Sequence, residues 1–399
     1  MKICDVVQSY SPTSGGVKRY ISNKMRCFAE RSDIGHAMIV PWQENRVDVE
    51  HNTRIYRVRS PHIPGSVDYR LLMNRKRIYD IVESVRPDIL EVDSAYLSSW
   101  IAIGAARQMS IPVVAYYHSD FPRRLSDKLG PCSALLAGVL DGMINRYLIH
   151  LYRRMDATVT ATREFQKILR KMGVKPVVRI PLGVNTEKFY PRDSRKAVFQ
   201  ELGLSEDTFL LLYAGRLAGM KNLDHLFAMM DLISGDNDRY HLALVGDGEL
   251  REEVVRAARE RKDISWIPYR SSRDELARWY SAADLFVHAG TRETFGLVSL
   301  EAQACGTRVI GVRGGGMEET LYRESPLIMA ENERPDALAR AVQQARKLAE
   351  TETDRQRRRH RILENFSWEN TFRRMAALYA HLCNGFSADT FTYGSDDAE

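Results

Sequence analysis

The sequence predicts an α/β protein of two doubly wound, Rossmann-like domains, and three observations support this prediction. The first is a regular alternation of short β-rich runs with longer amphipathic stretches along most of the chain. The second is a polar, turn-rich stretch with two prolines, 181–207, which interrupts that alternation. The third is the length of 399 residues, which is long for one domain and comfortable for two.

The first half of the chain predicts a mostly parallel sheet. Its candidate strands lie at 2–7, 37–41, 54–58, 88–92, 112–117, 157–161 and 176–180. Amphipathic stretches between the strands predict helices at 17–30, 71–85 and 97–109. Strands that alternate with helices are joined by right-handed crossovers into parallel sheets. We therefore expect an N-terminal domain over residues 1–184.

The second half repeats the pattern and predicts a C-terminal domain over residues 185–366. Its candidate strands lie at 208–215, 240–246, 264–268, 284–289 and 307–312. Its candidate helices lie at 222–233, 249–261, 273–282, 296–305 and 335–349. A last amphipathic segment, 367–384, predicts a C-terminal helix, and the polar segment 385–399 predicts a disordered tail. We expect the two domains to face a central cleft, since ligands of such folds bind at the carboxyl ends of the strands.

Composition narrows the class of protein. Hydrophobic residues make up 44% of the chain and charged residues 28%, as in ordinary globular proteins. The five cysteines are scattered without a CxxC pair, which argues against a disulfide framework and a structural zinc site. The N-terminus lacks the apolar region of a signal peptide, and no run of 18 apolar residues occurs. The expected location is therefore the cytoplasm.

The charge is unevenly distributed. Residues 1–184 carry 28 Lys and Arg against 17 Asp and Glu, a net +11, whereas residues 185–399 carry a net −5. The basic half suggests an anionic partner, either a membrane surface, a lipid-phosphate acceptor or a nucleic acid, or else a solubilising excess of charge. Nucleic acid is disfavoured because the cations are not clustered with aromatic residues. The stretch 123–155 combines apolar residues with arginines, so it predicts either peripheral contact with the inner face of a membrane or a core helix with a basic edge.

A pair of cations follows the first strand of the second half. In AGRLAGMKN (214–222), Arg216 and Lys221 flank a turn between a strand and a helix. Arginine can bind two phosphate oxygens at once and lysine adds a mobile charge, so this turn predicts a diphosphate site. The alternative is two solvated surface cations.

The string ETFGLVSLE (293–301) predicts a second part of the same site. Glu293 lies in a loop and Glu301 in the following helix, and carboxylates accept hydrogen bonds from sugar hydroxyls. Between them, Phe295, Gly296 and Leu297 begin the helix, where free N–H groups favour a phosphate. The alternative is a helix charge and an unrelated surface glutamate.

Two further motifs lie in the first half. In GGVKRY (15–20), Gly15 and Gly16 would let the backbone approach a ligand at the start of a helix, although an ordinary tight turn would look the same. The absence of GxGxxG disfavours a dinucleotide site. His118 in YYHSDFP ends a strand and could donate to a sugar hydroxyl, or it could be a structural histidine.

Taken together, these motifs resemble the retaining glycosyltransferases of family 4, which have the GT-B fold. The resemblance covers residues from the first strand to about 383. It rests on GGV (15–17), HSDFP (118–122), PLGVNTEKFYP (181–191), GRLAGMKN (215–222), VGDGEL (245–250), ETFGLVSLEAQACGTRVIG (293–311) and GGGMEE (314–319). The sequence departs from the common pattern at three positions, where Asn222 and Thr294 replace frequent glycines and Met317 a frequent proline.

The resemblance implies a hexosyltransferase that uses a nucleoside diphosphate sugar, either a UDP- or a GDP-sugar. It further implies retention at the anomeric carbon and a hydroxyl acceptor on a sugar, lipid or glycolipid. Arg216 and Lys221 would neutralise the leaving diphosphate. The implied donor contacts comprise Gly15, Gly16, His118, Glu293, Thr294, Phe295, Gly296, Leu297 and Glu301. No cofactor or metal is expected.

Two other functions are compatible with the same residues. One is a sugar-nucleotide epimerase or hydrolase on the same fold, which would turn over the donor without an acceptor. The other is a non-catalytic nucleotide-binding module. The combination of His118, Glu293, Arg216 and Lys221 favours catalysis over binding alone.

Overall fold

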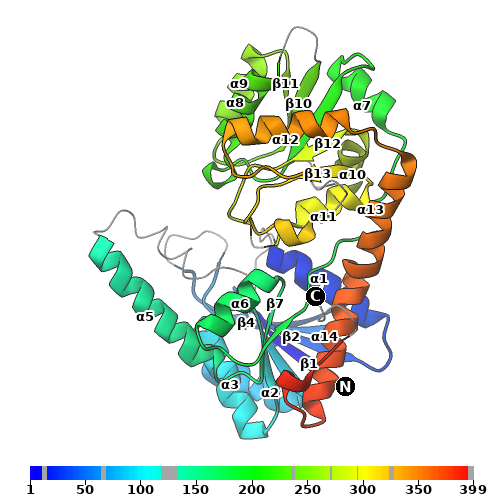
Figure 1. Ribbon diagram of the computed structural model, residues 1–399. Helices are drawn as coiled ribbons and strands as arrows, with labels where there is room; N and C mark the ends of the chain where they lie inside the picture. Colours follow the sequence, from blue (N-terminus) through cyan, green and yellow to red (C-terminus); the bar gives the residue numbers. More distant parts are fainter. Residues whose placement is uncertain are drawn as a thin grey trace. The chain divides into compact units, whose positions relative to one another are not determined.

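The computed structural model describes residues 1–10, 16–63, 69–117, 134–234, 239–269, 272–293, 295–322 and 328–393, with the backbone alone for 134–141. The chain divides into two compact units (Figure 1). The first contains Met1–Pro181 and Thr371–Glu399, and the second contains Leu182–Asn370. Each unit is an α/β domain with a parallel sheet, so the predicted fold class is confirmed.

The first unit contains an eight-stranded sheet in the order β3-β4-β2-β1-β5-β6-β7-β8. The strands are β1 (Lys2–Val6), β2 (Gly35–Trp42), β3 (Arg46–Glu50), β4 (Thr53–Arg59), β5 (Ile89–Val92), β6 (Val113–Tyr117), β7 (Ala157–Thr160) and β8 (Val177–Arg179). All neighbours pair in parallel except β3, which is antiparallel to β4. The strands expected from the sequence did not include β3; its Val47 and Val49 share one face, and both are exposed.

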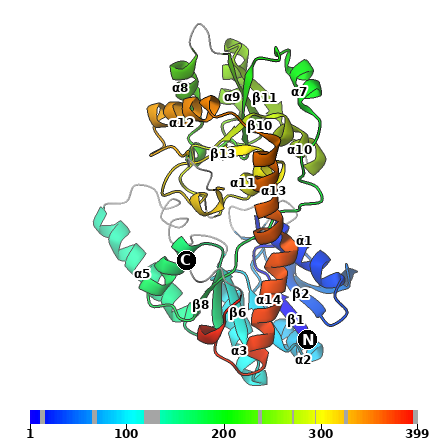
Figure 2. The same ribbon diagram turned by 45° about the vertical axis from the view of Figure 1, so that its right-hand side comes forward.

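Helices cover both faces of this sheet. They are α1 (Gly16–Ala29), α2 (Arg75–Val85), α3 (Leu97–Met109), α5 (Ala134–Tyr152), α6 (Arg163–Lys171) and α14 (Trp368–Cys383). The apolar sides of α2, α3, α5 and α6 form one core with the strands. On the other face, α1 and α14 pack together through the rings of Tyr20, Phe28 and Phe372. Figures 1 and 2 show α14 running along this sheet.

A buried ionic cluster lies under α1 and α14. The Lys24 ammonium, which is fully buried, donates to Asp5 Oδ1 at 2.8 Å and to the Tyr379 hydroxyl at 3.0 Å, and lies 3.1 Å from Glu91 Oε2. His36 Nε2 lies 3.0 Å from the other Asp5 oxygen. Burial alone would raise the pKa of Asp5, but Lys24 and His36 bring it below its usual value. Each charge is therefore compensated, as buried charges must be.

The segment after α14 differs from the predicted disordered tail. A 3-10 turn, η3, occupies Ala388–Thr390. The rings of Phe386 and Phe391 lie 5.1 and 5.5 Å from the His381 ring of α14. The aromatic residues of this polar segment thus find a surface on the helix, which the composition did not reveal. Residues 394–399 lie outside the described part of the chain.

The second unit contains a five-stranded parallel sheet in the order β11-β10-β9-β12-β13. The strands are β9 (Phe209–Ala214), β10 (Tyr240–Gly246), β11 (Ile264–Pro268), β12 (Leu285–Val287) and β13 (Arg308–Ile310), all as predicted to within a few residues. The chain runs outward from β9 through β10 to β11 and then returns to β12 on the other side of β9. The strand order therefore reverses between β9 and β12, which is where doubly wound sheets bind ligands.

The helices of this unit are α7 (Arg195–Leu202), α8 (Leu223–Ile233), α9 (Arg251–Glu260), α10 (Arg273–Ala282), α11 (Leu297–Ala304), α12 (Pro335–Lys347) and α13 (Glu352–Asn365), with the short 3-10 helices η1 (Gly219–Lys221) and η2 (Glu318–Thr320). The sequence did not predict α7, which lies in the expected linker, or the polar α13. None of the helices in the described parts of either unit is long and apolar enough to span a membrane.

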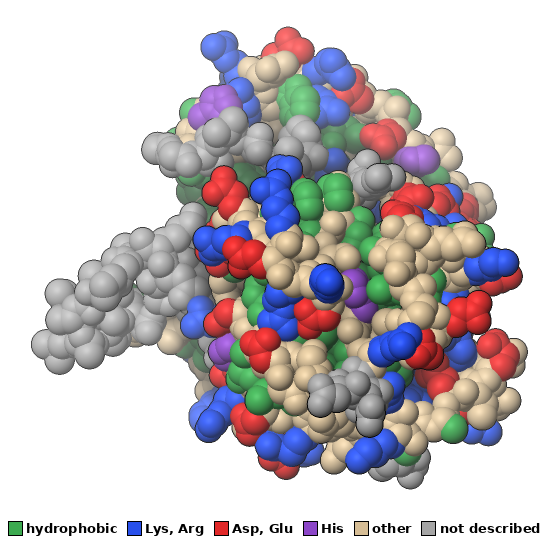
Figure 3. Space-filling view, turned by 90° about the horizontal axis from the view of Figure 1, so that it is seen from above, with side chains coloured by type: hydrophobic (Ala, Val, Ile, Leu, Met, Phe, Trp, Pro, Cys, Tyr) green, Lys and Arg blue, Asp and Glu red, His purple; other side chains and the backbone are tan. Residues whose placement is uncertain are grey.

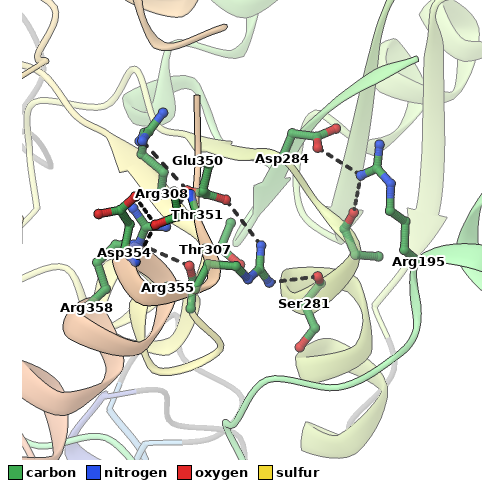
Figure 4. Close-up of polar contacts among 12 residues, drawn as sticks. Arg195, Ser281, Asp284, Thr307, Arg308, Glu350, Thr351, Asp354, Arg355 and Arg358 are labelled. Atoms are coloured by element: carbon green, nitrogen blue, oxygen red, sulfur yellow. Dashed lines mark hydrogen bonds and ion pairs between the residues drawn. The ribbon is translucent and has the colours of Figure 1, made fainter. Parts of the chain in front are cut away.

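An arginine cluster attaches α13 to the second unit (Figure 4). Thr351 and Asp354 form a capping box that begins the helix. Arg358 is buried, and its guanidinium donates to the Gly306 carbonyl at 3.0 Å and to Glu350. Glu350 also accepts from Arg355 at 3.3 Å. One carboxylate thus balances two helix arginines, and this explains how so polar a helix packs against the core.

We predict that Glu350→Gln destabilises the protein by about 3–5 kcal/mol, because it leaves the buried Arg358 charge without its carboxylate. Asp336→Asn is the matched control, since Asp336 pairs with Arg340 on the exposed side of α12 and such pairs contribute about 0–1 kcal/mol. Urea unfolding of both variants gives the free energies. If the free energy of unfolding fell by the same small amount in both variants, a structural role for Glu350 would be contradicted.

Candidate donor site

Two loops meet at the point where the second sheet reverses its strand order. The loop after β9 carries Arg216 and Lys221, and the loop after β12 carries Glu293. Asn222 joins the two loops, because its side-chain amide donates to the Ala289 carbonyl at 3.1 Å. Asn222 has a left-handed backbone, with φ of 52°, and asparagine tolerates this conformation better than most residues. This explains why asparagine can stand where glycine is frequent in the family.

Lys221 and Glu293, which the sequence assigned to one site, are in direct contact. The Lys221 ammonium donates to Glu293 Oε1, and the two side chains are only 13% and 20% exposed. His288 Nε2 lies 3.3 Å from the same carboxylate oxygen. Burial alone would raise the pKa of Glu293, but His288 and Lys221 outweigh it and lower the pKa to about 2. The carboxylate is therefore ionised at neutral pH and can accept hydrogen bonds.

His288, which directly follows β12, was not among the residues predicted from the sequence. It is 1% exposed, and its ring stacks on Tyr213 of β9 with centroids 5.7 Å apart. A single histidine at the end of an apolar strand resembles an ordinary core residue. The signal that could have identified it is its position five residues before Glu293, at the same strand end.

The side chain of Arg216 is exposed and makes no hydrogen bond or ion pair with the residues that the structure describes. Its backbone is fixed, however, since its carbonyl accepts from the Tyr213 hydroxyl at 2.9 Å. The adjacent Leu217 N–H donates to Asp247 O at 3.0 Å, which joins this loop to the GDGEL turn. A Cβ at Gly246 would lie 2.0 Å from the Gly215 carbonyl, so only glycine permits this close packing. A rigid turn thus carries a cation that is available to an anion.

The start of α11 completes the group. Gly296 caps the helix with φ of 82°, and a Cβ there would lie 2.2 Å from Met317 Cγ. Phe295 is buried against Phe366, with ring centroids 6.3 Å apart. Leu297 begins the helix, whose first N–H groups have no partner within the helix. The predicted residues 295–297 therefore form a rigid helix N-terminus.

Glu301 lies on α11 and is only 4% exposed. Its Oε2 accepts from the Tyr280 hydroxyl of α10 at 3.2 Å. Glu301 is thus held more deeply in the unit than Glu293, and the structure does not bring the two carboxylates into contact.

The first unit positions the other predicted motif. Asp93, at the end of β5, accepts hydrogen bonds from the backbone N–H groups of Gln8 and Ser9 at 2.9 Å each. This contact fixes the chain after β1, which leads to α1. Gly16 begins α1, and a Cβ there would meet no atom within 4 Å, so its surroundings are open. Gly15, His118 and Thr294 lie outside the described residues.

The described residues hold no group of three or more His, Cys, Asp and Glu side chains arranged as metal ligands. Figure 3 views the structure from above relative to Figure 1, and basic and acidic side chains are interspersed over the coloured part of that face.

Comparison with known protein families shows which family the sequence matches. Residues 194–361 match the family described as glycosyl transferases group 1, and residues 14–188 match the family described as Glycosyltransferase Family 4. The chain belongs to glycosyltransferase family 4. The Glycosyltransferase Family 4 match lies in the first unit for most of its length, and the group 1 match lies in the second unit.

Relatives of this family 4 glycosyltransferase include two mannosyltransferases of Mycobacterium tuberculosis. One is a GDP-mannose-dependent alpha-(1-6)-phosphatidylinositol dimannoside mannosyltransferase, 28% identical over 94% of this chain and 95% of its own length. The other is a GDP-mannose-dependent alpha-mannosyltransferase, 27% identical over 88% of this chain and 90% of its own. The chain is therefore a nucleotide-sugar glycosyltransferase.

Solved structures confirm the GT-B fold of this glycosyltransferase. Sucrose-phosphate synthase from Thermosynechococcus elongatus matches with a TM-score of 0.75 at 21% identity, over 96% of this chain and all of the other. WaaG, a glycosyltransferase involved in lipopolysaccharide biosynthesis, matches with a TM-score of 0.66 at 16% identity, over 96% of this chain and all of the other.

Proposed function

We propose that this glycosyltransferase moves a mannosyl group from GDP-mannose to a hydroxyl of a glycolipid acceptor, with retention at the anomeric carbon. The contact of Lys221 and His288 with Glu293 carries the proposal. Arg216 follows the same strand as Lys221, and α11 begins four residues after Glu293. This group combines two cations for a diphosphate with an ionised carboxylate for a sugar. The choice of GDP-mannose and of a glycolipid follows the printed functions of the mycobacterial relatives.

In the proposed reaction, the bond between the anomeric carbon and the diphosphate oxygen breaks while the acceptor oxygen bonds to the same carbon. Negative charge grows on the leaving diphosphate, and Lys221, Arg216 and the N–H groups at the start of α11 stabilise it. The acceptor proton passes to the departing phosphate oxygen. Glu293 accepts hydrogen bonds from the sugar hydroxyls, and Glu301 from the ribose. These residues supply the charge stabilisation without a metal ion.

Incubation of the protein with GDP-mannose and a mannosylated phosphatidylinositol tests the proposal. We expect a longer glycolipid whose new linkage is α from the first turnover, as NMR would show, and an unchanged rate in EDTA. In a thermal-shift series with UDP-, GDP-, ADP- and CDP-sugars, the GDP-sugar should stabilise the protein most, because only a bound ligand shifts the unfolding equilibrium.

Other outcomes would contradict parts of the proposal. A β linkage in the first product would exclude retention. Release of free mannose without any transfer would identify the protein as a hydrolase. Isomerisation of the donor sugar would identify it as an epimerase. If none of the nucleotide sugars raised the unfolding temperature or was turned over, the proposal as a whole would be wrong.

We predict that Lys221→Ala and Arg216→Ala each lower kcat roughly 10²–10³-fold, by analogy with the loss of one oxyanion-hole donor. The matched control is Arg340→Ala, which removes an exposed cation of the same unit from α12. Turnover of the control should stay within about twofold of the wild type in the same assay. Wild-type turnover in Lys221→Ala would exclude its role at the diphosphate.

We also propose that the first unit binds an anionic membrane surface through α3 and α5. The exposed side chains of Tyr96, Leu97, Met143 and Tyr147 form an apolar strip there, defined here as the α3–α5 strip. The Tyr147 hydroxyl donates to the Ala95 carbonyl just before α3 at 2.7 Å and accepts from Trp100 Nε1 of α3 at 3.1 Å, which joins the two helices. The exposed Arg146 lies beside the strip, and α5 extends away from its sheet in both ribbon views (Figures 1 and 2). An apolar strip with an adjacent cation suits an interface of acidic lipids.

Flotation with vesicles of phosphatidylglycerol and phosphatidylcholine at low salt tests this membrane proposal. We expect the wild type to float, and Leu97→Asp combined with Met143→Asp to remain at the bottom. Val49→Asp, at a 72% exposed valine of the same unit, should float like the wild type. Absence of wild-type binding at low salt would exclude the membrane contact.

A further inference from the structure

Each ring nitrogen of His288 has a polar neighbour. Its Nδ1 accepts from the Gly290 backbone N–H at 3.1 Å. A neutral ring whose Nδ1 is an acceptor carries its proton on Nε2, and this nitrogen lies 3.3 Å from Glu293 Oε1. The backbone of the β12 loop thus fixes which nitrogen of the ring faces the carboxylate, and makes it a donor.

Packing fixes the plane of the same ring. Tyr213 stacks against it at an interplanar angle of 28°. On the other side of the loop, a Cβ at Gly290 would lie 2.7 Å from His288 Cε1, so a larger residue at 290 would displace the ring. A buried ring with a stacked neighbour, a defined tautomer and a glycine that leaves it space cannot turn away from Glu293.

Lys221, the other partner of Glu293, is not held in this way. Lys221 lies in the short 3-10 helix η1, and its ammonium is at the end of a long, flexible side chain. Under the proposed function its ammonium is needed by the leaving diphosphate, whose charge exceeds that of one carboxylate. Glu293 then keeps His288 as its fixed donor while Lys221 turns to the phosphate.

We propose that His288 is a positioning residue that holds the Glu293 carboxylate on the transferred sugar. It would set recognition of the sugar and leave recognition of the nucleoside diphosphate to Arg216, Lys221 and α11. This inference rests on the proposed function, because it concerns how the same site distinguishes a nucleotide sugar from the nucleotide alone.

The decisive variants are His288→Phe and His288→Gln. Phenylalanine retains a ring to stack on Tyr213 but has no donor, whereas glutamine can bring an amide N–H near the position of Nε2. The matched control is His241→Gln, which removes a buried histidine of strand β10 in the same sheet, whose Nε2 contacts Ser265 at 2.9 Å. Thermal unfolding of all three variants reports any loss of folding.

Calorimetric titration with GDP and with GDP-mannose measures the effect. We expect His288→Phe to bind GDP within about twofold of the wild type, but to lose roughly 10–100-fold in affinity for GDP-mannose and in kcat/KM, as for the loss of a hydrogen bond to a charged group. His288→Gln should recover most of this loss. His241→Gln should keep the wild-type preference for the sugar nucleotide over GDP.

The failures of the two proposals are distinguishable. If the wild type binds no nucleotide or sugar nucleotide, the proposed function is wrong and the inference about His288 is wrong with it. If the wild type prefers GDP-mannose over GDP and His288→Phe retains that preference, only the inference about His288 is overturned. An equal loss of GDP and GDP-mannose affinity in His288→Phe would likewise reduce His288 to a packing residue.

Discussion

The candidate donor site depends on β9 and β12 being neighbours in the sheet of the second unit. Their residues pair in parallel, with Leu211 beside Leu285 and Leu212 beside Phe286. Because parallel strands end at the same edge, the pairing brings the loop with Lys221 to the loop with His288 and Glu293, although 72 residues separate Lys221 from Glu293. The contact that neutralises both charges is therefore a product of strand order.

Both units use the same arrangement at the reversal of their strand order. In the first unit, the order reverses at β1, and Asp93 after β5 fixes the chain after β1 through two backbone N–H groups. In the second unit, Asn222 after β9 and the carbonyl of Ala289 after β12 make the corresponding link. In each case a polar side chain hydrogen-bonds to the backbone of the other loop where the strand order reverses.

The sequence predicted most of the fold because most strands are buried on both faces and read as continuous apolar runs. Prediction from the sequence failed for elements whose burial in the structure does not follow their hydrophobicity. Strand β3 exposes Val47 and Val49, and α13 places the fully buried Arg358 where an apolar residue was expected. At the site, Lys221 and Glu293 lie in recognisable sequence motifs. His288, five residues before Glu293, resembles an ordinary core residue in the sequence, although it contacts the carboxylate. The pairing of Glu350 with arginines of α13 was equally invisible, since it depends on tertiary packing.

The ionic cluster of the first unit has a consequence for how the chain is made. Lys24, Asp5 and Glu91 are all among the first hundred residues, but the Tyr379 hydroxyl that completes their hydrogen bonding comes from the last helix. During synthesis, the hydrogen bonding of these three buried charges cannot be completed until Tyr379 has left the ribosome. The second unit, which is continuous from Leu182 to Asn370, can reach its native core before the first one does. Assembly of this enzyme therefore does not follow the order of its gene, and the unit translated first is the last to be finished.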